Sequence, residues 1–181
     1  MEKYKLLLGA DEAQKNIRDG IIIAADAIAP TLGVRGRKIV LDAEFGTMDI
    51  LDHGAGILEA IELEDTKLQM GVKMLREAAN KTSDKVGDGT TTTSILTKEL
   101  VRAVVPDVDP LLIKDKTGNI LKIKKELSDG VSKIIKFIDE HKINIDDKKI
   151  SDIATISSNS KEVGQILSEL FGKLGRGASV I

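Results

Sequence analysis

The feature that most constrains the fold is a helical spacing of aliphatic residues that recurs along the 181-residue chain. Apolar residues that repeat every three or four positions lie on one face of a helix and need a partner surface. The segments with this spacing are 10–29, 65–82, 94–105, 120–140 and 161–174. Two short β-like runs, 38–41 and 48–51, flank Phe45-Gly46 and predict a hairpin. The chain is therefore predicted to be mainly α.

The helical segments also predict which side chains are buried and where two helices begin. Asp65 and Ser160 stand where an N-cap residue would start a helix. A shorter helix near 147–155, a polar loop over 157–160 and a strand beginning at 178 complete the expected elements. The residues expected to face inward are Ala13, Ile17, Ile21, Ala24, Ile28, Leu68, Val72, Leu75, Ala79, Leu96, Leu100, Val104, Ile123, Leu127, Val131, Ile134, Ile138, Val163, Ile166, Leu167, Leu170 and Leu174.

Composition excludes several classes of function. The 27 basic and 29 acidic residues are balanced, so nucleic acid is not expected as a partner. No apolar run approaches the roughly 20 residues of a membrane span, and no signal peptide is evident. The chain has no cysteine, which excludes disulfides and Cys-ligated metals and fits a reducing compartment. We therefore expect a cytoplasmic location.

One motif points to phosphate chemistry. Asp88 lies between Gly87 and Gly89, and four threonines follow it before the helix expected from Ser94. A glycine-rich turn at a helix start presents N–H groups and the positive end of the helix dipole to an anion. A carboxylate there suits a bridging Mg²⁺, which takes carboxylate and phosphate oxygens together. Asp, Gly and Thr are also ordinary turn and cap residues, and the Gly-Lys-Ser/Thr ending of a P-loop is absent.

A second segment supports the nucleotide interpretation and leads to a family. Thr31, Leu32 and Gly33 precede Gly36-Arg37 and a β-run that ends at Asp42. Together with the 88–93 segment, this pattern resembles the adenine-nucleotide site of the GroEL-type (group I) chaperonins, and the resemblance covers nearly the whole chain. Other agreeing segments are Ala24-Ala25-Asp26-Ala27, Phe45-Gly46, Glu59-Ala60-Ile61-Glu62-Leu63-Glu64-Asp65, Met70-Gly71, Val86-Gly87 and Ile156-Ser157 with Asn159-Ser160. The run 36–42 is closest to the bacterial and organellar branch.

The resemblance implies an organisation and a set of partners. Residues 1–140 would be the N-terminal part of the helical equatorial domain, which binds ATP, and residues 141–181 the ascending part of the intermediate domain. The apical domain and the C-terminal equatorial part would be absent. Expected partners are other chaperonin subunits in a ring homo-oligomer, non-native polypeptides and a cochaperonin.

The resemblance also assigns residues. Asp88 would coordinate Mg²⁺, and Ile156 and Ser157 would lie near the base. The residues that would contact the phosphates are Thr31, Leu32, Gly33, Gly89, Thr90, Thr91 and Thr92.

The chain departs from the family at Asp52-His53-Gly54, where the family has Lys-Asp-Gly. The family Lys helps neutralise the phosphates, and the family Asp helps position the attacking water. One charge pair at ~6 Å and an effective dielectric of about 20 is worth roughly 2–3 kcal/mol, and replacing Lys by Asp reverses its sign. Asp52 and His53, the candidate catalytic residues, are thus expected to leave ATP binding weakened and hydrolysis impaired. Residues 106–119 depart as well, by an apparent insertion.

These observations leave two classes of function open. The first is a subunit, or an N-terminal fragment, of an ATP-dependent chaperonin that assists protein folding. The second is a non-catalytic assembly module, or an inactive fragment, that keeps the equatorial helices without turnover of its own. Whether the chain is a fragment or a natural short form is not decided by the sequence.

Overall fold

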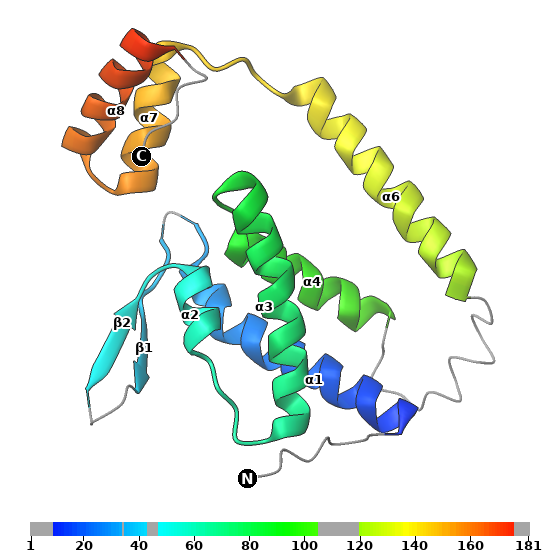
Figure 1. Ribbon diagram of the computed structural model, residues 1–181. Coiled ribbons are helices and arrows are strands. Elements are labelled where there is room, and N and C mark those ends of the chain that lie inside the picture. Colours follow the sequence, from blue (N-terminus) through cyan, green and yellow to red (C-terminus); the bar gives the residue numbers. More distant parts are fainter. Residues whose placement is uncertain (1–8, 34, 43–46, 105–119, 176–181) are drawn as a thin grey trace. The chain divides into compact units, whose positions relative to one another are not determined.

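The computed structural model describes residues 9–33, 35–42, 47–104 and 120–175, and it divides the chain into two compact units. The first unit, Met1–Gly118, contains helices, a short 3₁₀ turn and one hairpin (Figure 1). Its elements are α1 (Ala10–Ile28), η1 (Ala29–Thr31), β1 (Ile39–Asp42), β2 (Met48–Leu51), α2 (Gly54–Ala60), α3 (Thr66–Val86) and α4 (Thr90–Val104). The second unit, Asn119–Ile181, contains α6 (Ile120–His141), α7 (Asp147–Ser158) and α8 (Lys161–Leu174). The prediction of a mainly α chain with a small hairpin is confirmed.

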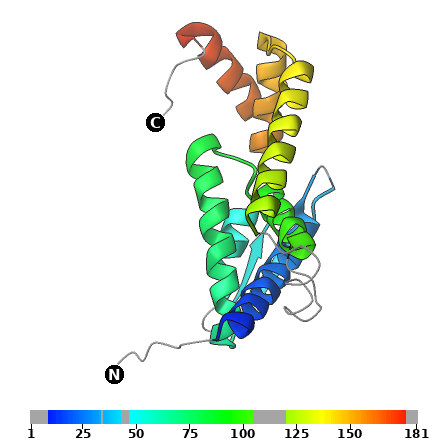
Figure 2. The same cartoon turned by 90° about the vertical axis from the view of Figure 1, so that its right-hand side faces the viewer.

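The first unit is organised around a close contact between α1 and α3, which lie side by side in both views (Figures 1 and 2). Gly20 of α1 faces Gly71 of α3. A Cβ at Gly20 would overlap the backbone carbonyl of Leu68, and a Cβ at Gly71 would overlap that of Ile17. The two helices can therefore approach to backbone contact only because both positions lack a side chain.

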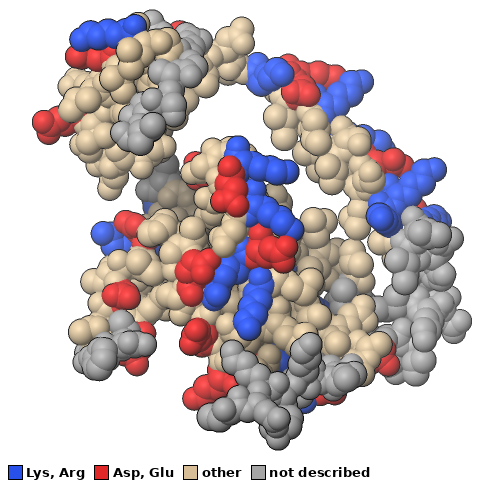
Figure 3. Space-filling view, viewed as in Figure 1, with Lys and Arg blue, Asp and Glu red and all other residues tan. Residues whose placement is uncertain are grey.

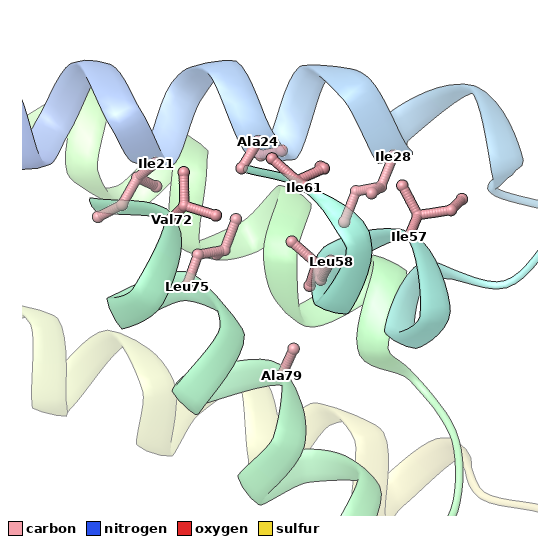
Figure 4. Close-up of a cluster of buried hydrophobic side chains, with 10 residues drawn as sticks. Ile21, Ala24, Ile28, Ile57, Leu58, Ile61, Val72, Leu75 and Ala79 are labelled. Atoms are coloured by element: carbon pink, nitrogen blue, oxygen red, sulfur yellow. The ribbon is translucent and has the colours of Figure 1, made fainter. Parts of the chain in front are cut away.

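The buried core lies beside this crossing (Figure 4). It consists of Ile21, Ala24, Ala25, Ile28, Ile57, Leu58, Ile61, Val72, Leu75 and Ala79, each less than 9% exposed. Helices α1, α2 and α3 supply all of these side chains except Ile61, which directly follows α2. Each helix therefore buries its apolar face against the other two. Burial of each Ile, Leu or Val contributes about 1.5–3 kcal/mol. Six of the positions predicted to face inward on α1 and α3 are in this core, Ile17 packs against it, and Ala13 and Leu68 are only partly buried.

The hairpin pairs β1 with β2 in antiparallel register, with Ile39 opposite Leu51 and Val40 opposite Ile50. Ile39 and Leu51 pack against the core. Val40 and Ile50 point to the other face of the strands and are exposed. The predicted hairpin is thus confirmed, while the predicted turn at Phe45-Gly46 lies outside the described residues.

The boundary between α3 and α4 differs from the prediction. The start of α3 is as expected, because the Asp65 carboxylate accepts a hydrogen bond from the Lys67 amide. Its end is at Val86, four residues later than predicted, and Gly87 caps it at a φ of 77°. Helix α4 begins at Thr90 and not at Ser94, since the Thr93 amide already donates to the Gly89 carbonyl.

The predicted buried stripe of α4 is wrong. Leu96 and Leu100 are 59% and 48% exposed, whereas Ser94 is fully buried and Val101 packs against the core. The Ser94 hydroxyl donates to the Thr90 carbonyl, so a polar residue can face the core without an unpaired group. This local hydrogen bond explains why the apolar spacing pointed to the wrong face.

In the second unit, α7 and α8 pack together. Asn159 ends α7 in the left-handed conformation, and the Ser160 hydroxyl accepts from the Val163 amide at the start of α8, as predicted. Residues 157 and 158, expected in a loop, are helical. Along α6 the predicted inward residues Leu127, Val131, Ile134 and Ile138 are exposed. The insertion at 106–119 and the strand from 178 lie outside the described residues, and the division into equatorial and intermediate domains stays a prediction.

Candidate nucleotide-binding site

Three separate segments of the first unit meet around a cavity of about 230 Å³. The first is the end of η1, the second is the junction between β2 and α2, and the third is the turn from α3 into α4. The lining residues are Thr31, Leu32, Gly33, Asp52, His53, Gly54, Asp88, Gly89, Thr90, Thr91 and Thr92. Every predicted site residue of the first unit therefore lies at one cavity.

Hydroxyl groups join the first and third segments. The Thr31 hydroxyl donates to the Ile28 carbonyl at 2.8 Å, and its oxygen lies 3.3 Å from the Thr91 hydroxyl. Because Thr31 uses its proton on Ile28, Thr91 is the donor in the second contact. In this arrangement both hydroxyl protons are used, and each oxygen keeps a lone pair that can accept a hydrogen bond from water.

Gly54 joins the second segment to the third, and no role was predicted for it. A Cβ on Gly54 would overlap the Thr91 hydroxyl and lie 3.3 Å from that of Thr90. The first residue of α2 is therefore in direct contact with the first turn of α4. The signal available in the sequence was a glycine in a predicted turn, where Gly is common for many reasons.

The turn that carries Asp88 has an unusual backbone. Gly87 and Gly89 have φ angles of 77° and 87°, a region that L side chains rarely adopt. Between them the Asp88 carboxylate is exposed and accepts a hydrogen bond from the Gly89 amide at 2.6 Å. The amides of the first helical turn have no partner within the helix. The site thus combines helix-end N–H groups and hydroxyls with one carboxylate.

Asp52 and His53 also face the cavity, and they have a neighbour that was not predicted. One Asp52 oxygen lies 3.8 Å from the Lys38 ammonium, and the other lies 3.5 Å from His53 Nδ1. The antiparallel register explains this, because Lys38 directly precedes Ile39, which pairs with Leu51. All three side chains are about two-thirds exposed. Lys38 offsets part of the Asp52 charge, although exposed ion pairs contribute only about 0–1 kcal/mol.

The donor set fits a polyphosphate with one divalent cation. Among the described residues, no group of three or more His, Asp or Glu side chains is placed to hold a metal ion by itself. Asp88 supplies a single carboxylate, so a hard cation at this site needs oxygen ligands from elsewhere. Phosphate oxygens held by the hydroxyls and helix-end amides of 90–92 would supply them.

Ile156 and Ser157 are in the second unit. Ile156 is 74% exposed near the end of α7, and Ser157 lines a different groove of about 660 Å³ with Ile153, Leu167 and Phe171. Their predicted place beside the base of the nucleotide stays a prediction.

Comparisons with known proteins show which family the chain is similar to. The model of the TCP-1/cpn60 chaperonin family matches residues 24–180. The chaperonin gp146 from the bacteriophage EL 2 (Pseudomonas aeruginosa), solved in the presence of ATP-BeFx, is 23% identical in both of its crystal forms. Form II gives a TM-score of 0.71, with 93% of this chain and 29% of that chain covered; form I gives 0.72, with 96% and 30%. A group III chaperonin in the open state is 21% identical, with a TM-score of 0.72 and coverage of 91% and 32%.

The chain thus spans about a third of the length of these solved chains. The likeness shows a shared fold, and it does not separate the branches of the family. In the part of the chain that the structure describes, no helix is long and apolar enough to cross a membrane. On the face shown in Figure 3, Lys and Arg alternate with Asp and Glu along α3, so no uniformly basic surface is seen there.

Proposed function

Because the chain belongs to the TCP-1/cpn60 chaperonin family, we propose that it serves as an ATP-binding part of a chaperonin subunit. The observation that carries this proposal is the meeting of three distant segments at one cavity of hydroxyls, helix-end amides and a carboxylate. Nothing in the packing of α1 on α3 requires a Gly-Asp-Gly turn followed by four threonines. A site for phosphate oxygens and a cation does require such groups.

The proposed roles follow from the chemistry of each group. Thr31 and Thr91 hold each other through their hydroxyls, and Thr91 can turn its proton from Thr31 to a phosphate oxygen when a nucleotide binds. The amides of Thr90, Thr91 and Thr92 face the phosphate charge at the positive end of α4. Asp88 is the ligand for Mg²⁺, which when bound supplies positive charge that neutralises the phosphates.

We propose that this site favours binding over turnover. His53 is exposed and is a candidate base for water, but it is not an anion. Asp52 is an anion, but its carboxylate lies between the Lys38 ammonium and the His53 ring. Neither residue therefore reproduces the Lys-Asp pair that the family resemblance leads one to expect, and hydrolysis is expected to be slow.

The wider function belongs to the same proposal. A subunit of this family would act in a ring with other chaperonin subunits, on non-native polypeptides and with a cochaperonin, in the cytoplasm. Residues 1–140 would form equatorial structure and residues 141–181 intermediate structure. The bacterial and organellar branch remains the expected one on the run from Gly36 to Asp42.

A second candidate is a non-catalytic assembly module. The observation that favours it is apolar surface on two helices: Leu96 and Leu100 on α4, and Ile134, Phe137 and Ile138 on α6, are all exposed. Such surface suits contact with further protein. The two candidates differ in one property, because only the first requires nucleotide to bind.

Calorimetry with ATP and Mg²⁺ distinguishes them. The chain is expected to bind ATP·Mg²⁺, and Asp88→Asn is expected to remove the gain in affinity that Mg²⁺ provides. Asp84→Asn is the matched control, since this exposed carboxylate lies four residues earlier and outside the cavity. No heat of binding at high protein concentration would reject the first candidate and leave the second.

A further inference from the structure

We propose that Thr82 and Thr93 are positioning residues for Asp88, joined by a hydroxyl–hydroxyl hydrogen bond that braces the turn between α3 and α4. The inference rests on the proposed ATP site, because a fixed carboxylate matters only if it has a cation to bind. Neither threonine lines the cavity, whereas Thr90, Thr91 and Thr92 all do. The brace therefore accounts for the fourth threonine of the motif, for which the nucleotide site has no use.

The hydrogen bonds run in one direction from α4 into α3. The Thr93 hydroxyl donates to the Thr82 hydroxyl oxygen at 3.1 Å, and the Thr82 hydroxyl donates to the Ala78 carbonyl at 3.2 Å. Both threonines are partly buried. The Thr93 amide separately donates to the Gly89 carbonyl at 2.9 Å. Thr93 is thus attached both to the end of α3 and to the turn.

The hydrogen bonds of the turn itself are local, because the Gly87 amide donates to the Ser83 carbonyl at 2.7 Å and the Gly89 amide donates to the Asp88 carboxylate at 2.6 Å. Residues 87–89 comprise two glycines at positive φ and one aspartate whose side chain is exposed. Glycine has the greatest backbone freedom, so the position of Asp88 depends on contacts from outside the turn. Thr82 lies beside the turn, since its Cγ2 methyl is 3.7 Å from the position that a Cβ of Gly89 would take, and its hydroxyl supplies the contact through Thr93.

The hydrogen bond between Thr82 and Thr93 predicts which part of ATP affinity is lost when it is removed. Without the bond between Thr82 and Thr93, the α4 N-terminus loses its side-chain hydrogen bond to the end of α3, although the two helices still pack against each other. The Asp88 carboxylate then samples more positions and must be ordered when the cation binds, which lowers affinity. One buried hydrogen bond corresponds to about a three- to tenfold change in binding.

The test uses two single variants of the 181-residue chain, Thr82→Val and Thr93→Val. Each replaces the hydroxyl by a methyl group of similar shape. Thr82→Ser keeps the hydroxyl and is expected to restore binding. Thr97→Val, one helical turn beyond Thr93, is the control on α4. Calorimetry with ATP is performed with and without Mg²⁺, and hydrogen exchange of the amides of 87–93 is measured without ligand.

Each Val variant at 82 or 93 is expected to lower ATP affinity about three- to tenfold in Mg²⁺ and to leave affinity without Mg²⁺ within about twofold. Exchange of the turn amides is expected to rise while the α1 amides stay protected. An equal loss with and without Mg²⁺ would show a structural role only and overturn the proposal. Unchanged exchange in both variants would overturn it as well. If the unsubstituted chain binds no ATP, the proposed function fails, and the exchange data still decide whether the brace exists.

Discussion

Asp52 places a carboxylate at the cavity with the Lys38 ammonium 3.8 Å away. The charge at this position is the main electrostatic difference from the pattern that the rest of the site follows. Lys38 directly precedes the neighbouring strand, and its ammonium lies beside the Asp52 carboxylate and is not free to serve a phosphate. The local net charge of the Lys38–Asp52 pair is zero, so neither residue contributes net attraction for ATP.

Restoring the cation should therefore tighten binding. For Asp52→Lys with His53→Asp, we expect about tenfold or more higher ATP affinity, since an anion is replaced by a cation near the phosphates. Turnover, measured as phosphate release, should rise in the same variant. Lys38→Gln in the original chain should weaken binding, because it leaves Asp52 without its counter-ion. Equal turnover before and after the double substitution would contradict the account of Asp52 and His53.

A second prediction for a single residue concerns Gly54. Gly54→Ala inserts a methyl group where the Thr91 hydroxyl lies, which is expected to cost about 1–3 kcal/mol of stability and to weaken ATP binding. Gly130→Ala in α6 is the control, because a Cβ there meets nothing within 4 Å and favours the helix. Urea unfolding gives the first quantity and calorimetry the second. A Gly54→Ala chain as stable as the original would show that α2 does not need to be in close contact with α4.

At the scale of elements, helix ends and helix crossings are controlled by a few small or polar residues. Asp65, Gly87 and Ser160 set boundaries through side-chain caps or a left-handed glycine. Gly20 and Gly71 set the distance between α1 and α3. Because these residues act through backbone geometry, their substitution should move or separate whole helices.

Gly71→Ala should separate α1 from α3. The added methyl would overlap the Ile17 carbonyl, which is backbone and cannot rotate away. We expect the first unit to lose about 1–3 kcal/mol or more of unfolding free energy, measured by urea denaturation. Gly172→Ala in α8, where a Cβ meets nothing within 4 Å, is the matched control and should not be destabilised. Similar midpoints for both variants would contradict the close crossing.

Lys98 links α4 to α1 and gives a pH prediction. Its ammonium lies 2.6 Å from the Asp26 carboxylate, and this hydrogen bond raises the pKa of Lys98 above 10.5, against the smaller lowering by burial. A raised lysine pKa stabilises the folded chain fully below the unfolded pKa. That stabilisation is lost as pH rises through the higher folded pKa. The Lys98→Met chain should therefore lose less unfolding free energy than the original chain as pH rises from about 10.5 through the higher folded pKa. If the unfolding free energies of the two chains fell in parallel with pH, Lys98 would not be the cause of the pH dependence.

Most helices and both core-forming stripes of α1 and α3 could be predicted, because apolar spacing and caps are local properties. The start of α4 could not, because four threonines resemble a loop and only the Thr93–Gly89 hydrogen bond makes them helical. The exposed side of α4 was mistaken for the buried side for a related reason: Ser94 is buried through a hydrogen bond that spacing does not reveal. The site residues 31–33 and 88–92 came from motif and resemblance. Lys38 and Gly54 depend on strand register and helix contact, which no motif contains.

At the scale of the whole molecule, much aliphatic surface is uncovered. Along α6, Val131, Ile134, Phe137 and Ile138 are at least half exposed, and none of the described side chains of this helix is fully buried. A helix with one apolar face is stabilised mainly by packing of that face. The chain by itself therefore presents surface suited to association.

We expect the isolated chain to associate in a concentration-dependent way. Sedimentation velocity should show species larger than 19.5 kDa at high concentration. Val131→Lys with Ile138→Lys should reduce association, because charges on the apolar face resist burial. Ser132→Lys, on the same helix but not an apolar position, should leave it unchanged. A monomer at every concentration would count against apolar surface as the cause.

The glycine contact between α1 and α3 has a mechanical consequence. Helix α3 has 21 residues, and Gly71 divides it unequally, with five residues before it and fifteen after it. At 1.5 Å per residue these arms are ~8 and ~23 Å long. If α3 tilts about this contact as a rigid rod, a shift of ~3 Å at its Asp88 end becomes ~1 Å at the Asp65 end, in the opposite direction. The crossing would then act as a fulcrum that reduces movement near the phosphates about threefold before it reaches the Lys67–Glu12 ion pair at the other end of the helix.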